Sequence, residues 1–79
     1  MFKVSFEDYI KTLIGLLNKR DTYTARARQA TDEINHITWC ALATGVDIEI
    51  DDLMDLFGYY FEPEELTVDY LTSHLNEIV

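Results

Sequence analysis

The chain has 79 residues, a formal net charge of −9 and a hydrophobic content of 48%, which allow one small domain (1–79) and exclude a disordered chain. The single Cys40 excludes an intrachain disulfide framework. No apolar run approaches the roughly 18 residues that a membrane span requires. The sequence therefore predicts a cytoplasmic protein, in a bacterial or host cytosol. The negative charge disfavours direct binding to nucleic acid or to an anionic membrane.

A first helix is predicted from Ser5, whose hydroxyl is a favourable N-cap, and Val4 is expected to pack on Tyr9 as a hydrophobic staple. Glu7 and Lys11 have the spacing of a stabilising ion pair on one helix face. Apolar residues follow with helical periodicity: Phe6, Ile10, Leu13 and Leu17. The polar residues 18–21 predict the end of this helix.

A second helix is predicted from Thr22 or Thr24 to about Thr44, with Gly45 as the residue that ends it. Its expected apolar stripe consists of Ala27, Ala30, Ile34, Ile37 and Ala41, widened by Leu42 and Trp39.

Residues 46–50 alternate between apolar and polar, which is also a strand signature, but no pairing partner for a strand is visible. We therefore expect a third helix from Asp47 or Ile48 that ends at Pro63. At 100° per residue, one side of it collects the apolar residues Ile50, Leu53, Met54, Phe57, Tyr60 and Phe61. The opposite side collects acidic residues, with Gly58 and Tyr59 among them.

A last helix is predicted from Glu64 or Thr67 to about Ile78, and its expected apolar side consists of Leu66, Leu71, Leu75 and Ile78, with Val68 alongside. Acids in its first turn suit the positive end of the helix dipole. The fold class that follows is all-α, a small compact bundle of three to four helices.

Sequence patterns for catalysis are incomplete. Cys40 follows His36 by four residues, the spacing of a Cys–His pair on one helix face. Its neighbours Trp39 and Ala41 favour a small core residue instead. We predict no enzymatic activity and no catalytic residue.

Patterns for metal binding are incomplete as well. Glu33 and His36 have the E-x-x-H spacing of di-metal centres, but the chain lacks a second such motif. Asp47-x-Glu49-x-Asp51 begins like a calcium loop, but neither the glycine at the sixth position nor the glutamate at the twelfth is present. We predict no metal site and no cofactor.

The charge is distributed very unevenly along the chain. All six Lys and Arg residues lie within residues 1–28, whereas residues 29–79 contain twelve Asp and Glu residues and no Lys or Arg. The basic residues Lys19, Arg20, Arg26 and Arg28 are expected to face acids within the chain. The remaining acids have few partners, which predicts an acidic interaction surface.

That surface is expected on the third and fourth predicted helices. Its candidate protein-binding residues are Asp47, Glu49, Asp51, Asp52, Asp55, Tyr59, Glu62, Glu64, Glu65 and Asp69. Tyr59 is included because a tyrosine among carboxylates supplies a large contact area with a polar tip. The stretch 55–60 is similar to the acidic, tyrosine-bearing third helix of the colicin immunity proteins, which are small acidic inhibitors of nucleases. The likeness covers these six residues only and serves as an analogy.

The function expected from these residues is inhibition or regulation of a basic protein, such as a nucleic-acid-binding protein or nuclease. Mimicry of nucleic acid, of the kind that phage proteins use, would require the acids of the two helices to share one side. The alternative is a structural or homo-oligomeric helical subunit with an apolar interface. Leu16, Ile14, Leu56 and Ile48 lie off the predicted core stripes and are the candidates for it.

Overall fold

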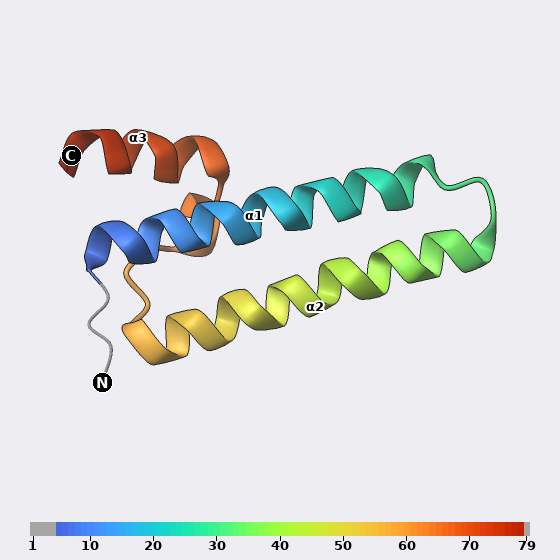
Figure 1. The fold of residues 1–79 in the computed structure, drawn as a ribbon, viewed down its shortest axis with the longest axis horizontal. Helices are drawn as coiled ribbons and strands as arrows, with labels where there is room; N and C mark the ends of the chain where they lie inside the picture. The colour runs from blue at the N-terminus through green and yellow to red at the C-terminus, as the bar shows by residue number, and fades with distance from the viewer. Residues whose placement is uncertain (1–4, 79) are drawn as a thin grey trace.

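The computed structural model describes residues 5–78, and within them it contains three α-helices and a 3₁₀ turn. These are α1 (Phe6–Gln29), α2 (Glu33–Phe57), η1 (Pro63–Glu65) and α3 (Val68–Ile78). Long helices α1 and α2 form an antiparallel hairpin, and α1 lies between α2 and α3 (Figure 1). The all-α prediction is confirmed for this part of the chain, and the stretch 46–50 is helical.

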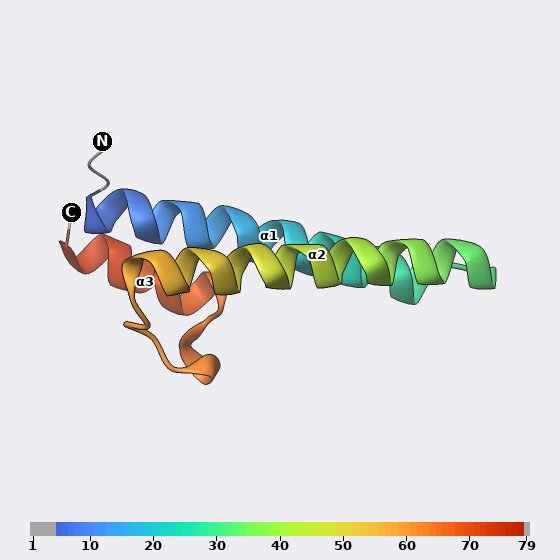
Figure 2. The same ribbon diagram turned by 90° about the horizontal axis from the view of Figure 1, so that it is seen from below.

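The molecule is elongated, with extents of 43 × 28 × 19 Å. Helix α3 covers the end of the hairpin that holds the start of α1, while the other half of the hairpin carries no third helix (Figure 1). In the perpendicular view, η1 and its flanking loops stand out to one side of the hairpin (Figure 2). Nowhere in residues 5–78 does a helix have the length and apolar character needed to cross a membrane.

Helix α1 begins as predicted. Ser5 is its N-cap and accepts a hydrogen bond of 3.1 Å from the backbone N–H of Asp8. Lys11 Nζ lies 3.0 Å from Glu7 Oε1, which confirms the predicted ion pair. The expected contact of Val4 with Tyr9 lies outside the described residues.

The predicted break at residues 18–21 was wrong, because α1 continues without interruption to Gln29. Lys19 and Arg20 have good helix propensity, and the segment contains no glycine or proline. The packing face also continues past it, since half-buried Arg20, half-buried Thr24 and buried Ala27 follow Leu17 at helical spacing.

The chain reverses at residues 30–32 instead. Asp32 caps α2 by accepting hydrogen bonds of 2.8 Å from the N–H of Asn35 and 2.6 Å from its side-chain amide. Aspartate competes for backbone hydrogen bonds and favours an N-cap over a helix interior. The hairpin turn is therefore placed by a capping residue.

The predicted helix end at Gly45 was also wrong, because α2 runs through it. An interior glycine costs a helix roughly 0.5–1 kcal/mol relative to alanine. Burial of Val46 and Ile50 directly after it against α1 offsets that cost.

Helix α2 ends at Phe57, six residues before Pro63, so the predicted end there was wrong. Gly58 has φ 111° and ψ 155°, a conformation that only glycine adopts readily, and its N–H bonds to the Met54 carbonyl. Tyr59 and Tyr60 consequently lie in the loop, and Tyr60, predicted on the core side, is exposed.

The core lies at the end of the hairpin that α3 covers. Its buried residues are Tyr9, Ile10, Leu13, Leu17, Val46, Ile50, Met54, Phe61 and Leu71. In the other half of the hairpin only Ala27 is buried among the described residues, and Trp39 is half-buried. The apolar stripe predicted for the second helix is therefore largely wrong, because Ile34, Ile37, Ala41 and Leu42 are exposed.

The candidate acidic interaction surface

The first part of the candidate surface is a cluster of carboxylates around Tyr59. The Tyr59 phenol donates a hydrogen bond to the Asp55 carboxylate. That bond, a partial loss of hydration and the charges of Asp55, Asp51 and Asp52 raise the pKa of Tyr59 to about 12. We call Asp51, Asp52, Asp55 and Tyr59 the Tyr59 cluster.

All four members of the Tyr59 cluster are exposed, and Tyr59 keeps 62% of its surface in contact with solvent. Within residues 5–78, none of its three carboxylates forms an ion pair. The cluster is thus an uncompensated negative patch with an aromatic ring in it.

Asp47, one turn earlier on α2, has a different environment. Its carboxylate lies 3.5 Å from the Arg20 guanidinium of α1, which also lies 3.7 Å from Asp21. The expectation that basic residues face acids of the chain is confirmed for Arg20. Because Asp47 is paired, the row of free acids along α2 is shorter than the sequence suggested.

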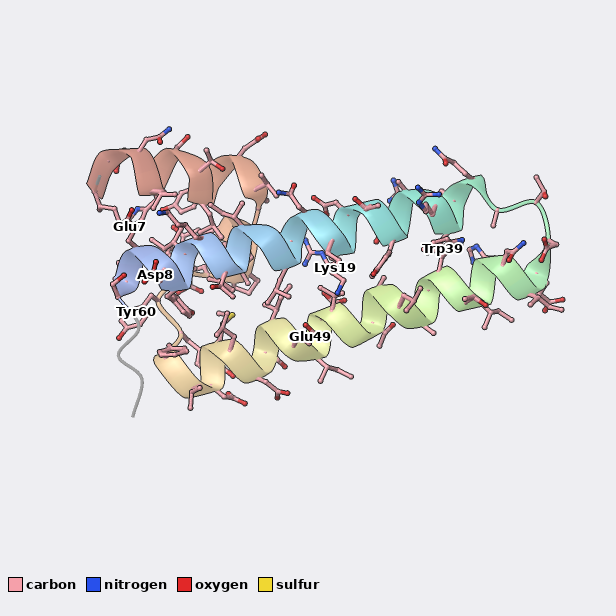
Figure 3. The ribbon with its side chains drawn as sticks, viewed as in Figure 1. Glu7, Asp8, Lys19, Trp39, Glu49 and Tyr60 are labelled. Carbon is pink, nitrogen blue, oxygen red and sulfur yellow. The ribbon has the colours of Figure 1, made fainter. Side chains whose placement is uncertain are left out.

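Other basic residues of α1 contact aromatic rings. Arg26 lies over the Trp39 ring, with 5.3 Å between its guanidinium carbon and the ring centroid, and the Lys19 amine lies 5.9 Å from the Tyr23 centroid. Trp39 lies between α1 and α2 near the turn, 5.7 Å from Tyr23 (Figure 3). The contacts of Arg26 and Tyr23 with Trp39 hold α1 against α2 where few apolar residues are buried.

The second part of the candidate surface surrounds η1. Glu65 Oε1 accepts a 2.8 Å hydrogen bond from the N–H of Glu62, and its carboxylate also accepts one from the Tyr70 phenol. The bond from Tyr70 is the larger cause of a lowered pKa of Glu65. Glu62 and Glu65 therefore have local structural roles, whereas Glu64 and Asp69 are simply exposed.

The structure thus groups the predicted residues in two sets. Asp51, Asp52, Asp55 and Tyr59 lie together at the end of α2, and Glu62 and Glu65 lie together at η1. Helix α1 lies between α2, which carries most of the first set, and α3, which follows the second set in the chain (Figure 1). The Tyr59 cluster is the set in which several free carboxylates gather around one exposed ring.

Glu49 belongs to neither set and lines a groove between α1 and α2; Figure 3 labels it near the middle of α2. The groove has a volume of about 380 Å³, and its other lining residues are Thr12, Leu16, Asp52, Leu53 and Leu56. Leu16 and Leu56 are among the residues expected to form an apolar interface. Sequence periodicity missed that they share one groove, since they come from different helices.

Cys40 is exposed, so its prediction as a core residue was wrong. On α2 the residues that turn toward α1 at this level are half-buried Trp39 and Ala43. The Cys40 Sγ lies 3.6 Å from His36 Nε2, and His36 Nδ1 donates to the Ala27 carbonyl at 2.8 Å. The imidazole therefore joins the start of α2 to the end of α1.

Residues 5–78 contain no group of three or more His, Cys, Asp or Glu side chains arranged to hold a metal ion. Comparison with known proteins gives no identity either: neither a protein-family model, nor a curated protein, nor a solved structure matches this chain.

Proposed function

We propose that this chain is a non-enzymatic binding protein that inhibits or regulates a basic protein by occupying its nucleic-acid-binding surface. The observation that carries the proposal is the Tyr59 cluster, in which three carboxylates free of ion pairs in residues 5–78 surround an exposed phenol. Uncompensated charges of one sign speed association with an oppositely charged surface. Tyr59 adds a ring that can be buried on contact.

The proposed partner is a nuclease or another nucleic-acid-binding protein, because such proteins present Lys and Arg side chains to phosphates. A close imitation of duplex spacing is not required. Asp51 and Asp55 lie about 6 Å apart along the helix axis, at 1.5 Å per residue, whereas a duplex presents a charge about every 1.7 Å. A compact acidic patch that blocks part of a phosphate-binding groove fits the free carboxylates better.

The test is capture of the partner from a lysate of the source cell with the tagged protein, at low and at moderate salt. A variant with Asp51→Asn, Asp52→Asn and Asp55→Asn removes the carboxylates of the cluster. A matched variant with Glu64→Gln, Asp69→Asn and Glu77→Gln removes the same charge from η1 and α3.

We expect a nucleic-acid-binding partner that dissociates at moderate salt, is lost with the first variant and is retained by the second. If both folded variants retained the partner equally, the acidic residues would form only a solvated surface, and the proposal would fail.

A second candidate function, a self-associating structural subunit, is favoured by exposed isoleucines on α2. Ile34, Ile37 and Ile48 are 78%, 57% and 58% exposed, and with Ala41 they fall on the helix side opposite buried Val46 and Ile50. Contiguous exposed apolar side chains mark contact sites. Sedimentation equilibrium of the wild type against Ile37→Gln tests it, since a structural subunit would show a concentration-dependent mass that the substitution abolishes.

A further inference from the structure

The groove between α1 and α2 has an apolar interior and an acidic rim. Leu16 and Leu53 form part of its lining, and both pack against the buried core. Leu56, which also lines it, is 76% exposed although the next residue, Phe57, packs on Tyr9 with ring centroids 5.6 Å apart. The position of Leu56 is therefore held by a packed neighbour while its own side chain remains in water.

The rim carries the charges of Glu49 and Asp52. Neither side chain forms an ion pair within residues 5–78. Asp52 also belongs to the Tyr59 cluster, so the groove opens beside the carboxylates of that cluster, which form no ion pair within residues 5–78. Exposed apolar surface beside free carboxylates favours an occupant that offers apolar side chains flanked by cations.

A second copy of this chain does not supply that occupant. Two grooves placed face to face would bring the Glu49 and Asp52 carboxylates of both copies together, and like charges at an interface are unfavourable. Within residues 5–78, several cations are already engaged: Lys11 pairs with Glu7, Arg20 pairs with Asp47, and Arg26 lies over Trp39. The groove is open and shallow, which suits the side chains of a helix lying along it better than an enclosed small molecule.

We propose that this groove is the docking site for a basic amphipathic helix of the partner protein, with bulky apolar side chains between Leu16, Leu53 and Leu56 and with Lys or Arg residues against Glu49 and Asp52. This inference rests on the proposed function and specifies the part of the partner that is bound. The Tyr59 cluster attracts the partner, and the apolar contact slows its dissociation.

The probe is a fluorescent 18-residue peptide of Leu and Lys with one apolar helix face, compared with a scrambled peptide of the same composition that lacks such a face. Binding is measured by fluorescence anisotropy, and methyl NMR spectra report on Leu16, Leu53 and Leu56. Leu56→Ser tests the groove, and its matched control is Ile34→Ser, which changes an equally exposed residue of α2 outside the groove. Circular dichroism verifies that both variants fold.

We expect the amphipathic peptide to bind with shifts of the three leucine methyls. Leu56→Ser should weaken its binding by roughly tenfold, the effect of losing one well-buried apolar contact, and Ile34→Ser should leave it unchanged. Glu49→Gln with Asp52→Asn should weaken binding and reduce its salt dependence.

Equal binding of the scrambled peptide, or no effect of Leu56→Ser, would overturn the groove proposal. The capture experiment then separates the two proposals. If the variant with Asp51→Asn, Asp52→Asn and Asp55→Asn still failed to capture the partner, the proposed function would stand without the groove. A dimer of the protein alone that Leu56→Ser dissociates would also overturn it, because the occupant would then be a second copy.

Discussion

The phenol of Tyr9 in α1 donates a 3.0 Å hydrogen bond to the carbonyl oxygen of Gly58, the C-cap residue that directly follows α2. The two residues are 49 positions apart in the chain. Tyr9 is buried, and burial is the main cause of a raised pKa of its phenol, with Tyr60 contributing. This bond fixes the end of α2, and therefore the Tyr59 cluster, relative to the core.

Tyr9→Phe should lower the free energy of unfolding by about 1 kcal/mol, because it removes the hydrogen bond to a partly buried carbonyl and keeps the ring packing. Urea denaturation followed by circular dichroism measures the change. Tyr60→Phe is the control, since the exposed Tyr60 phenol has no hydrogen-bond partner within residues 5–78. Equal losses in the two variants would contradict a specific role of the Tyr9 bond.

Gly58→Ala should lower the free energy of unfolding by on the order of 1–3 kcal/mol, the usual cost of a side chain at such backbone angles. A Cβ atom at this position would also lie 3.0 Å from the ring of Tyr60, but that side chain is exposed, so a shift of a few tenths of an ångström relieves the contact. The backbone conformation is therefore the main cause. Urea denaturation again provides the measurement.

Gly45→Ala is the matched control, because Gly45 is helical and a Cβ atom there would meet nothing within 4 Å. We expect this substitution to raise the free energy of unfolding by roughly 0.5–1 kcal/mol. If Gly45→Ala instead lowered the free energy of unfolding, a helix break at position 45, which the sequence suggested, would be populated in solution.

Asp32→Ala should destabilise the protein by about 1 kcal/mol, the typical value for the loss of an N-cap. The side chain accepts two hydrogen bonds from Asn35, and few apolar residues are buried near the hairpin turn. Hydrogen exchange should therefore accelerate first at the start of α2. Thr31→Ala changes the neighbouring exposed residue, and a comparable effect of that control would argue against capping.

Tyr59 should titrate near pH 12, and Asp55→Asn should bring its pKa back toward the ordinary value of 10.0. Because the pKa is raised in the folded state, the contribution of this residue to stability is complete below pH 10 and is lost as the pH rises through about 12. The ζ-carbon signal of Tyr59 in NMR spectra, assigned with Tyr59→Phe, follows the titration. A pKa unchanged by Asp55→Asn would contradict the contact.

Features that depend on neighbours within one helix were predictable from the sequence. The Ser5 cap, the Glu7–Lys11 pair and the buried face with Leu13 and Leu17 all involve residues three or four positions apart. The acidic side of α2 follows from the same periodicity. Tyr59 was expected beside Asp55 on a helix, but it makes that contact from the loop after Gly58.

Helix boundaries were predicted less well, because tertiary packing outweighs weak local signals. Residues 18–21 and Gly45 resemble helix ends when taken alone, but α1 and α2 pack along each other on both sides of these positions. Interhelical packing stabilises a helix by more than one unfavourable residue costs.

The sequence by itself determined the helical fold class, the acidic charge of residues 29–79 and the residues available for a binding surface. Only the tertiary structure decided which acids stay free, since Arg20 reaches Asp47 from 27 positions away. It also decided that Leu16 and Leu56 share a groove and that Ile34, Ile37 and Ile48 of α2 face water. The physical reason is that periodicity assigns a side chain to a face of its own helix, whereas the docking of helices decides what that face meets.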